Sequence, residues 1–185
     1  MSPSEVHSPP RRRWFDRRFE LGLPREAFLD ILERVRGTPA RLEERVRGLT
    51  ASVLVQRIGE AWSIQENIGH LLDLEELWAG RLDDFLHGAK QLRPADLQNR
   101  KTHEARHNDR PLEDLLTAFR SARLTTVERL EALGPADLDR TALHPRLAQP
   151  MSVIDHFFFV AEHDDHHLAA IGGLIRAHRS RGVGA

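Results

Sequence analysis

The 185-residue chain contains no cysteine, and this absence removes several kinds of chemistry. Disulfide bonds, thiolate metal ligands and a cysteine nucleophile are all excluded. A metal ion would therefore have to be bound by histidine, carboxylate or water. The absence of cysteine also agrees with a cytoplasmic location, which we expect for this protein.

The sequence also lacks a large charge of one sign and a long apolar run. Lysine and arginine number 27 against 28 acidic residues, so the net charge is −1 and the basic excess of a nucleic-acid-binding protein is missing. No apolar run approaches the ~20 residues that cross a membrane. Charged arginines stand where a secretion signal needs an apolar centre. We expect neither a nucleic-acid partner nor a membrane partner.

The length of the chain is that of one domain with one core. We expect a flexible or loosely docked, arginine-rich arm over residues 1–24, a helical bundle over residues 25–178 and a frayed C-terminus over residues 179–185. The first ten residues contain little to bury and are expected to be disordered.

Five arginines fall within residues 11–18, next to three aromatic residues. We favour an arm in which Trp14, Phe15 and Phe19 dock on the bundle while the arginines stay in water. The alternative is an arm that binds phosphates or an acidic partner.

Four segments place apolar residues at the spacing of one helix face, and they predict four helices. The first covers about residues 24–48, with a kink or a break at Gly37-Thr38-Pro39. The other three begin near Ser63, Pro111 and Ser152. Ser63 and Ser152 are each followed three residues later by an acidic residue, which is the pattern of a capping box.

Two polar connections, at about residues 89–110 and 134–150, separate these helices and show no convincing strand pattern. A connection of this length means that the helices it joins need not be antiparallel. The sequence therefore predicts an all-α fold, a four-helix bundle with long crossover loops.

Two histidines of the fourth predicted helix, His163 and His167, lie four residues apart. They fall about 40° apart around the helix, on its apolar face, so both rings should point into the bundle. His70 stands at the edge of the apolar stripe of the second predicted helix and could face a neighbouring helix. The three rings could therefore meet at one point.

Buried histidines are costly unless each ring finds a partner. One divalent cation would satisfy three neutral rings, and a three-histidine site keeps coordination positions open for water or substrate. The alternative is a separate hydrogen bond from each ring to a carboxylate or a backbone carbonyl. We favour the metal site, because two of the rings share one helix face.

Four further polar residues stand near this expected site. Asn67 and Glu75 fall in the apolar sector of the second predicted helix, whereas Asp164 and His166 flank that of the fourth. Each could orient a metal ligand or move protons, since groups bonded to a ligating histidine fix its tautomer. An ordinary rim residue paired with arginine is the alternative, and we name no general base.

His103 and His107 are also four residues apart, but their surroundings have no apolar face. We expect a solvated segment there, at the mouth of a pocket, rather than a second metal site. Trp62 and Trp78 are expected in the core or in a pocket wall.

The segments Trp62-Ser63-Ile64, Gly69-His70-Leu71-Leu72-Asp73 and Glu162-His163-Asp164-Asp165-His166-His167 resemble the DinB-like (YfiT-like) metalloenzyme superfamily. The likeness extends from Phe28 to about Arg176. It implies an up-down-down-up four-helix bundle with a divalent ion, nickel or zinc more often than iron or manganese. By position, the implied ligands are His70, His163 and His167, whereas His166 matches a histidine that is not usually a ligand.

Characterised members of the family that this sequence resembles include enzymes that attach low-molecular-weight thiols to electrophiles, and a thiol-dependent maleylpyruvate isomerase. We therefore expect a metal-dependent thiol S-transferase that acts on small electrophiles with a low-molecular-weight thiol as co-substrate. A metal-dependent hydrolase is the alternative within the same class. A non-catalytic, metal- or ligand-binding stress-response bundle is the alternative from another class. A homodimer is also expected.

Overall fold

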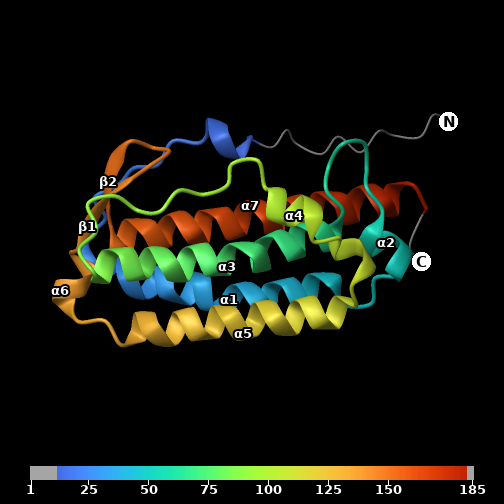
Figure 1. Cartoon of the computed structure of the whole chain (residues 1–185). Coiled ribbons are helices and arrows are strands. Elements are labelled where there is room, and N and C mark those ends of the chain that lie inside the picture. The colour runs from blue at the N-terminus through green and yellow to red at the C-terminus, as the bar shows by residue number, and fades with distance from the viewer. Residues whose placement is uncertain (1–11, 183–185) are drawn as a thin grey trace.

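The computed structural model describes residues 12–182, which form a bundle of four long helices (Figure 1). These helices are α1 (Phe28–Val46), α3 (Ile64–Leu86), α5 (Leu112–Glu131) and α7 (Val153–Ser180). Figure 1 shows α1 and α7 running in one direction, and α3 and α5 in the other. The course is therefore up-down-down-up, as the family resemblance implied. Each helix packs against two others: α1 and α3 both contact α5 and α7.

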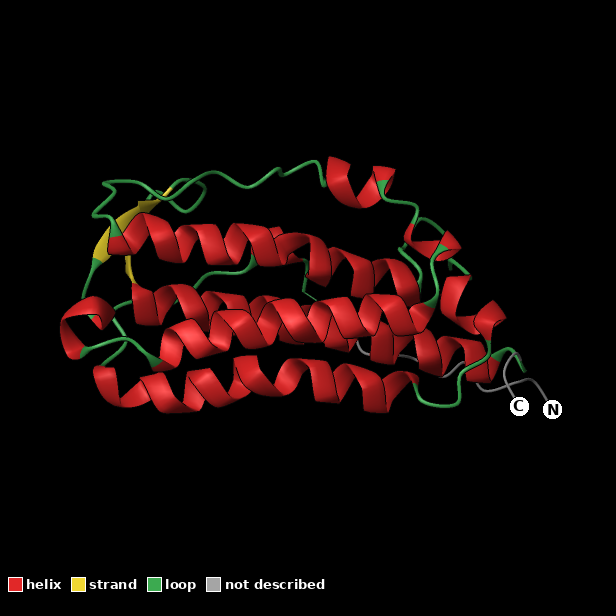
Figure 2. Ribbon diagram, turned by 60° about the horizontal axis from the view of Figure 1, so that its bottom comes forward, coloured by secondary structure: helices red, strands yellow, loops and turns green. Residues whose placement is uncertain are grey.

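Short elements close the two ends of the bundle (Figure 2). Helix α2 (Ala51–Val55) lies at one end, whereas α6 (Pro135–Leu138) lies at the other. Helix α4 (Arg100–Glu104) follows the long connection after α3. Three 3₁₀ turns complete the helical elements of residues 12–182: η1 (Trp14–Asp16), η2 (Arg25–Ala27) and η3 (His107–Asp109).

The expectation that the loops contain no strand is wrong. Strands β1 (Thr141–His144) and β2 (Gln149–Ser152) form an antiparallel hairpin just before α7. Each strand has only four residues, too few to show a clear alternating pattern, and β2 contains Pro150. The hairpin also depends on a distant segment, because Leu143 exchanges backbone hydrogen bonds with Lys90 and Leu92.

Local signals set the starts of the two helices that carry the site. Ser63 accepts a hydrogen bond from the backbone N–H of Glu66 at 3.0 Å, and the Glu66 carboxylate accepts one from the backbone N–H of Ser63 at 2.8 Å. Ser152 and Asp155 make the same reciprocal pair at the start of α7. Both predicted capping boxes are confirmed. Helix α1 continues through Pro39 without a break.

The apolar core has two parts, one toward the hairpin end and one toward the α2 end. Trp14 and Phe19 of the arm pack against the hairpin-end core, whereas Phe15 is 57% exposed. The expectation for residues 1–10, and that for residues 183–185, lie outside the described residues. Among the described helices, none combines the length and the apolar character needed to cross a membrane.

Candidate metal centre

Helices α3 and α7 bring three histidines together between them. His70, His163 and His167 each offer a ring nitrogen, and these nitrogens lie within 4.8 Å of one another. The ring centroids of His163 and His167 are 4.6 Å apart, and those of His70 and His167 are 4.8 Å apart. The cluster arises because one turn of α7 separates His163 from His167 and α3 packs alongside. All three side chains are buried.

A hydrogen-bonded chain fixes the orientation of the His70 ring. The hydroxyl of Thr102 donates to Asp73 Oδ2 at 2.9 Å, so its oxygen is free to accept a hydrogen bond from His70 Nδ1 at 3.0 Å. The proton of His70 therefore lies on Nδ1, and its Nε2 carries the lone pair. That tautomer suits a metal ligand.

Asn67 fixes the orientation of the His167 ring in the same way. Its amide nitrogen donates to the carbonyl oxygen of Ser63 at 2.7 Å, which turns the amide oxygen toward His167. His167 Nδ1 donates to that oxygen at 2.8 Å and leaves Nε2 as the acceptor. Of the four polar residues expected near the site, Asn67 thus contacts a histidine directly.

The third ring is held by packing. The ring of His163 stands edge-on to Trp14, with their centroids 4.9 Å apart. Its Nδ1 is buried without a hydrogen-bond partner among the described residues. His166 lines one pocket together with the three clustered histidines. Its ring also lies against Trp14, with their ring centroids 5.6 Å apart.

Burial keeps His70 and His163 neutral. Loss of solvation lowers the pKa of His70 to about 4, despite the nearby Asp73. It lowers the pKa of His163 well below the usual histidine value. Neutral imidazole is the form that binds a metal ion, so these two rings need no deprotonation at neutral pH.

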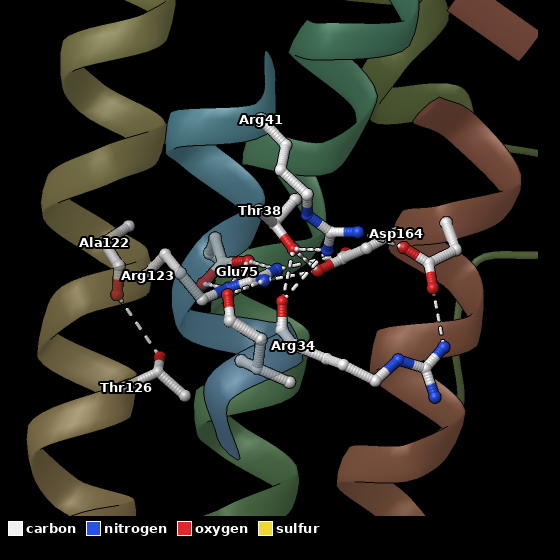
Figure 3. A network of polar contacts seen from close by, with 10 residues as sticks. Arg34, Thr38, Arg41, Glu75, Ala122, Arg123, Thr126 and Asp164 are labelled. Carbon is white, nitrogen blue, oxygen red and sulfur yellow. Dashed lines mark hydrogen bonds and ion pairs between the residues drawn. The ribbon is translucent and has the colours of Figure 1, made fainter. Parts of the chain in front are cut away.

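Glu75 and Asp164 do not lie at the rim, as the alternative supposed, but are buried and paired with one arginine (Figure 3). Arg123 of α5 donates to Glu75 Oε1 from Nη2 at 2.6 Å, and its Nη1 donates to Asp164. Thr38 donates to Asp164 at 2.8 Å. Both carboxylates therefore balance the charge of Arg123 within the bundle.

Arg123 was not among the predicted site residues, although its spacing on α5 indicated an inward position. It continues the stripe of apolar residues that points inward from α5, between Phe119 and Val127. A charged residue at an inward position requires buried counter-charges, and Glu75 and Asp164 were the candidates.

The expectation of a solvated segment around His103 and His107 is wrong for His107. His103 is exposed, but the His107 ring is buried and its Nε2 lies 2.8 Å from Asp73 Oδ2. Element η3 folds back on α3, where Gly69 leaves room for the ring. Because this room comes from a residue far away in the sequence, the local pattern did not reveal it.

A pocket of about 370 Å³ opens onto the three histidines. All three tryptophans of the chain, Trp14, Trp62 and Trp78, line it. Trp62 lies 4.7 Å from His70 between ring centroids, and Trp78 lies 5.8 Å from His163. The size and the aromatic walls suit a small molecule with an apolar part.

The sequence matches the family model described as the DinB superfamily over residues 34–171. The chain belongs to the DinB superfamily. Among curated proteins, no relative matches the chain.

Solved structures of similar fold agree with membership of the DinB superfamily. One is YfiT from Bacillus subtilis, described as a probable metal-dependent hydrolase with an unusual four-helix bundle topology. It is 19% identical, with a TM-score of 0.76 over 91% of this chain and 95% of YfiT. Another is a mycothiol-dependent maleylpyruvate isomerase, which is 12% identical, with a TM-score of 0.62 over 81% of this chain and 61% of that protein. At these identities the likeness shows a shared fold.

Proposed function

We propose that this protein is a metal-dependent enzyme in which His70, His163 and His167 hold one divalent ion. The observation that carries the proposal is the convergence of three buried ring nitrogens within 4.8 Å of one another, on the wall of a pocket. Nickel or zinc is the favoured ion, with iron or manganese as alternatives, because imidazole ligands suit all of them.

The residues present fit such an ion. His70 and His163 are neutral, His70 and His167 each have Nδ1 engaged in a hydrogen bond, and the Nδ1 of His163 has no partner among the described residues. Three protein ligands leave coordination positions for water or substrate, as in catalytic sites. A bound divalent ion would supply Lewis acidity that lowers the pKa of a water or a thiol toward neutrality.

The surrounding residues would prepare this chemistry. Thr102 would keep His70, and Asn67 would keep His167, in the tautomer that presents Nε2. Trp62 and Trp78 would hold the apolar part of a substrate and exclude bulk water from the pocket. We assign no protein side chain as general base.

Within this class, we favour transfer of a low-molecular-weight thiol to a small electrophile. The similarity to a mycothiol-dependent isomerase supports a thiol co-substrate, whereas the similarity to YfiT supports hydrolysis as the second candidate. In both cases the substrate would be a small molecule that fits the pocket. The homodimer remains a prediction.

Elemental analysis and a conjugation screen test this proposal together. Protein purified without a histidine tag is expected to contain a divalent ion and to consume electrophiles faster in the presence of a thiol. Consumption that does not depend on the thiol would indicate hydrolysis instead. His163→Ala should lose both the ion and the turnover, whereas His103→Ala, at an exposed histidine, should retain both. Protein without metal, or turnover that survives His163→Ala, would contradict the proposal.

A further inference from the structure

Two arginines line the same pocket as the three histidines, and neither has a carboxylate partner in the described part of the chain. They are Arg81 of α3 and Arg146 of the turn between β1 and β2. Most other described arginines in and around the bundle form ion pairs. Arg123 in particular is neutralised by two buried carboxylates. The other described arginines without an ion pair are exposed, so the two pocket arginines stand out as buried or half-buried cations without a counter-charge.

Arg81 lies on the same face of α3 as His70, three turns further along. The helical rise places their Cα atoms about 16 Å apart along the axis. The Arg81 side chain is 1% exposed, and its Cζ lies 5.6 Å from the centroid of Trp78. The Trp78 ring in turn contacts His163. One aromatic ring thus stands between the guanidinium and the histidine cluster.

The hydrogen bonds of Arg81 hold it in place without neutralising it. Its Nε donates to the carbonyl oxygen of Arg93 at 3.0 Å, and its Nη1 lies 3.1 Å from His144 Nε2. Burial lowers the pKa of His144 to about 4, so that ring is neutral. Nη2 of Arg81 makes no hydrogen bond to the described residues.

Arg146 approaches the pocket from the hairpin. Its Cζ lies 5.3 Å from the centroid of Phe15 and 5.8 Å from that of Phe159. Its Nη2 is buried and has no hydrogen-bond partner among the described residues. The guanidinium is therefore held between two aromatic rings with a donor group unused.

The acidic groups nearby are already engaged. Asp84 accepts three hydrogen bonds from the side chain of Arg93 and one from its backbone N–H. Asp96, the one carboxylate among the described residues that line the pocket, is exposed and accepts from Arg100. Burial lowers the pKa of Arg81 only to about 10, so it stays protonated at neutral pH. A buried cation without a counter-charge is costly unless a ligand supplies one.

We propose that Arg81 and Arg146 bind the carboxylate of a small molecule whose apolar middle lies along Trp78 and Phe159 and whose reactive end reaches the three histidines. This assignment of substrate class rests on the proposed function. Guanidinium groups bind carboxylates through charge-assisted, often bidentate hydrogen bonds, which fix the orientation of the ligand as well as its affinity. A pocket of about 370 Å³ limits the ligand to a small molecule.

The test measures ligand binding to protein from which metal has been removed with a chelator. Metal-free protein is used because a carboxylate would also bind a metal ion, so the outcome is independent of the proposed catalysis. The probes are 4-phenylbutyrate and its neutral amide, and the readout is tryptophan fluorescence, because all three tryptophans line the pocket. We expect the carboxylate to bind at least about ten-fold more tightly than the amide.

Substitutions assign this preference to the two arginines. Arg146→Gln and Arg81→Gln should each remove most of the preference for the carboxylate, whereas Arg81→Lys should keep part of it because it keeps the charge. Arg140→Gln is the matched control, because Arg140 is exposed, pairs with Asp137 and does not line the pocket. A thermal melt of each variant identifies any that fails to fold. If the Arg81 variants fail, the test uses Arg146→Gln, because Arg146 is only half-buried.

Three results would overturn the proposal. Equal binding of the acid and the amide by the wild-type protein is the first. A preference that survives in both folded glutamine variants is the second. The third is a preference for 3-phenylpropylphosphonate over the carboxylate by about ten-fold or more, which would indicate a phosphate-type ligand instead.

Discussion

The ring of His107 lies directly against the backbone of Gly69, the residue that precedes the candidate ligand His70. A Cβ atom added at Gly69 would come within 2.2 Å of His107 Cγ. His107 in turn contacts Asp73, which accepts the hydroxyl proton of Thr102. Because Gly69 has no side chain, the His107 ring can lie against α3 and contact Asp73. Asp73 in turn holds the Thr102 hydroxyl that accepts a hydrogen bond from His70.

Gly69→Ala should therefore weaken the metal site as well as the fold. The methyl group would displace His107, and we expect a loss of about 1–3 kcal/mol in the free energy of unfolding from overpacking. Metal affinity, measured by competition with a chromophoric chelator, should fall about ten-fold as Asp73 and Thr102 shift. Gly173→Ala in α7 is the control, because its nearest contact would be an ordinary 3.9 Å from Arg176. Unchanged affinity in Gly69→Ala would contradict this account.

Thr102→Val should lower metal affinity without removing a ligand. Valine keeps the shape of threonine but removes the oxygen that accepts from His70 Nδ1 and the proton that Asp73 accepts. We expect affinity to fall by about ten-fold or more, because such orienting groups typically contribute that much. Thr102→Ser should restore most of the affinity. Equal affinities of the valine and serine variants would show that the hydroxyl does not orient His70.

Arg123→Met should be strongly destabilising, because it leaves Glu75 and Asp164 buried without a counter-charge. We expect a loss of about 3–5 kcal/mol in the free energy of unfolding, measured with urea at neutral pH. Arg120→Met is the control on the same helix, since Arg120 pairs with Glu43 at the surface and should cost less than about 1 kcal/mol. Similar losses in the two variants would refute a special role for the buried network.

Acid should destabilise the protein through His156, which is fully buried and neutral. Burial lowers its folded-state pKa well below the ordinary value of 6.5. The unfolded chain therefore binds a proton that the folded chain excludes, so the stability is fully present above about pH 6.5 and is lost as the pH falls below it. His156→Leu should reduce the slope of unfolding free energy against pH by as much as about 1.4 kcal/mol per pH unit below pH 6. The measurement uses chelator-treated protein, and an unchanged slope would contradict the prediction.

Local patterns in the sequence predicted much of the fold and part of the site. The spacing of His163 and His167 indicated a shared inward face, and the serine–acid pairs at Ser63 and Ser152 predicted two helix starts that the structure confirms. These features depend on residues within one or two turns of each other. They can therefore be read from the sequence without knowledge of the neighbouring helices.

Contacts between distant segments could not be predicted in this way. The hairpin needs Lys90 and Leu92 to pair with Leu143, and the burial of His107 needs the space above Gly69. The spacing on α5 indicated that Arg123 points inward, but it did not specify that Glu75 and Asp164 would both pair with it. Each of these depends on how whole helices pack, which the local spacing of residues does not specify.

X-ray absorption spectroscopy at the metal edge, on protein purified without a histidine tag, tests the central claim most directly. The account predicts about one divalent ion per chain, with three imidazole nitrogens and at least one oxygen of water in its coordination shell. His70→Ala should remove one imidazole from that shell or release the ion. Protein that contains no stoichiometric metal, or an ion whose coordination does not change in His70→Ala, would contradict it.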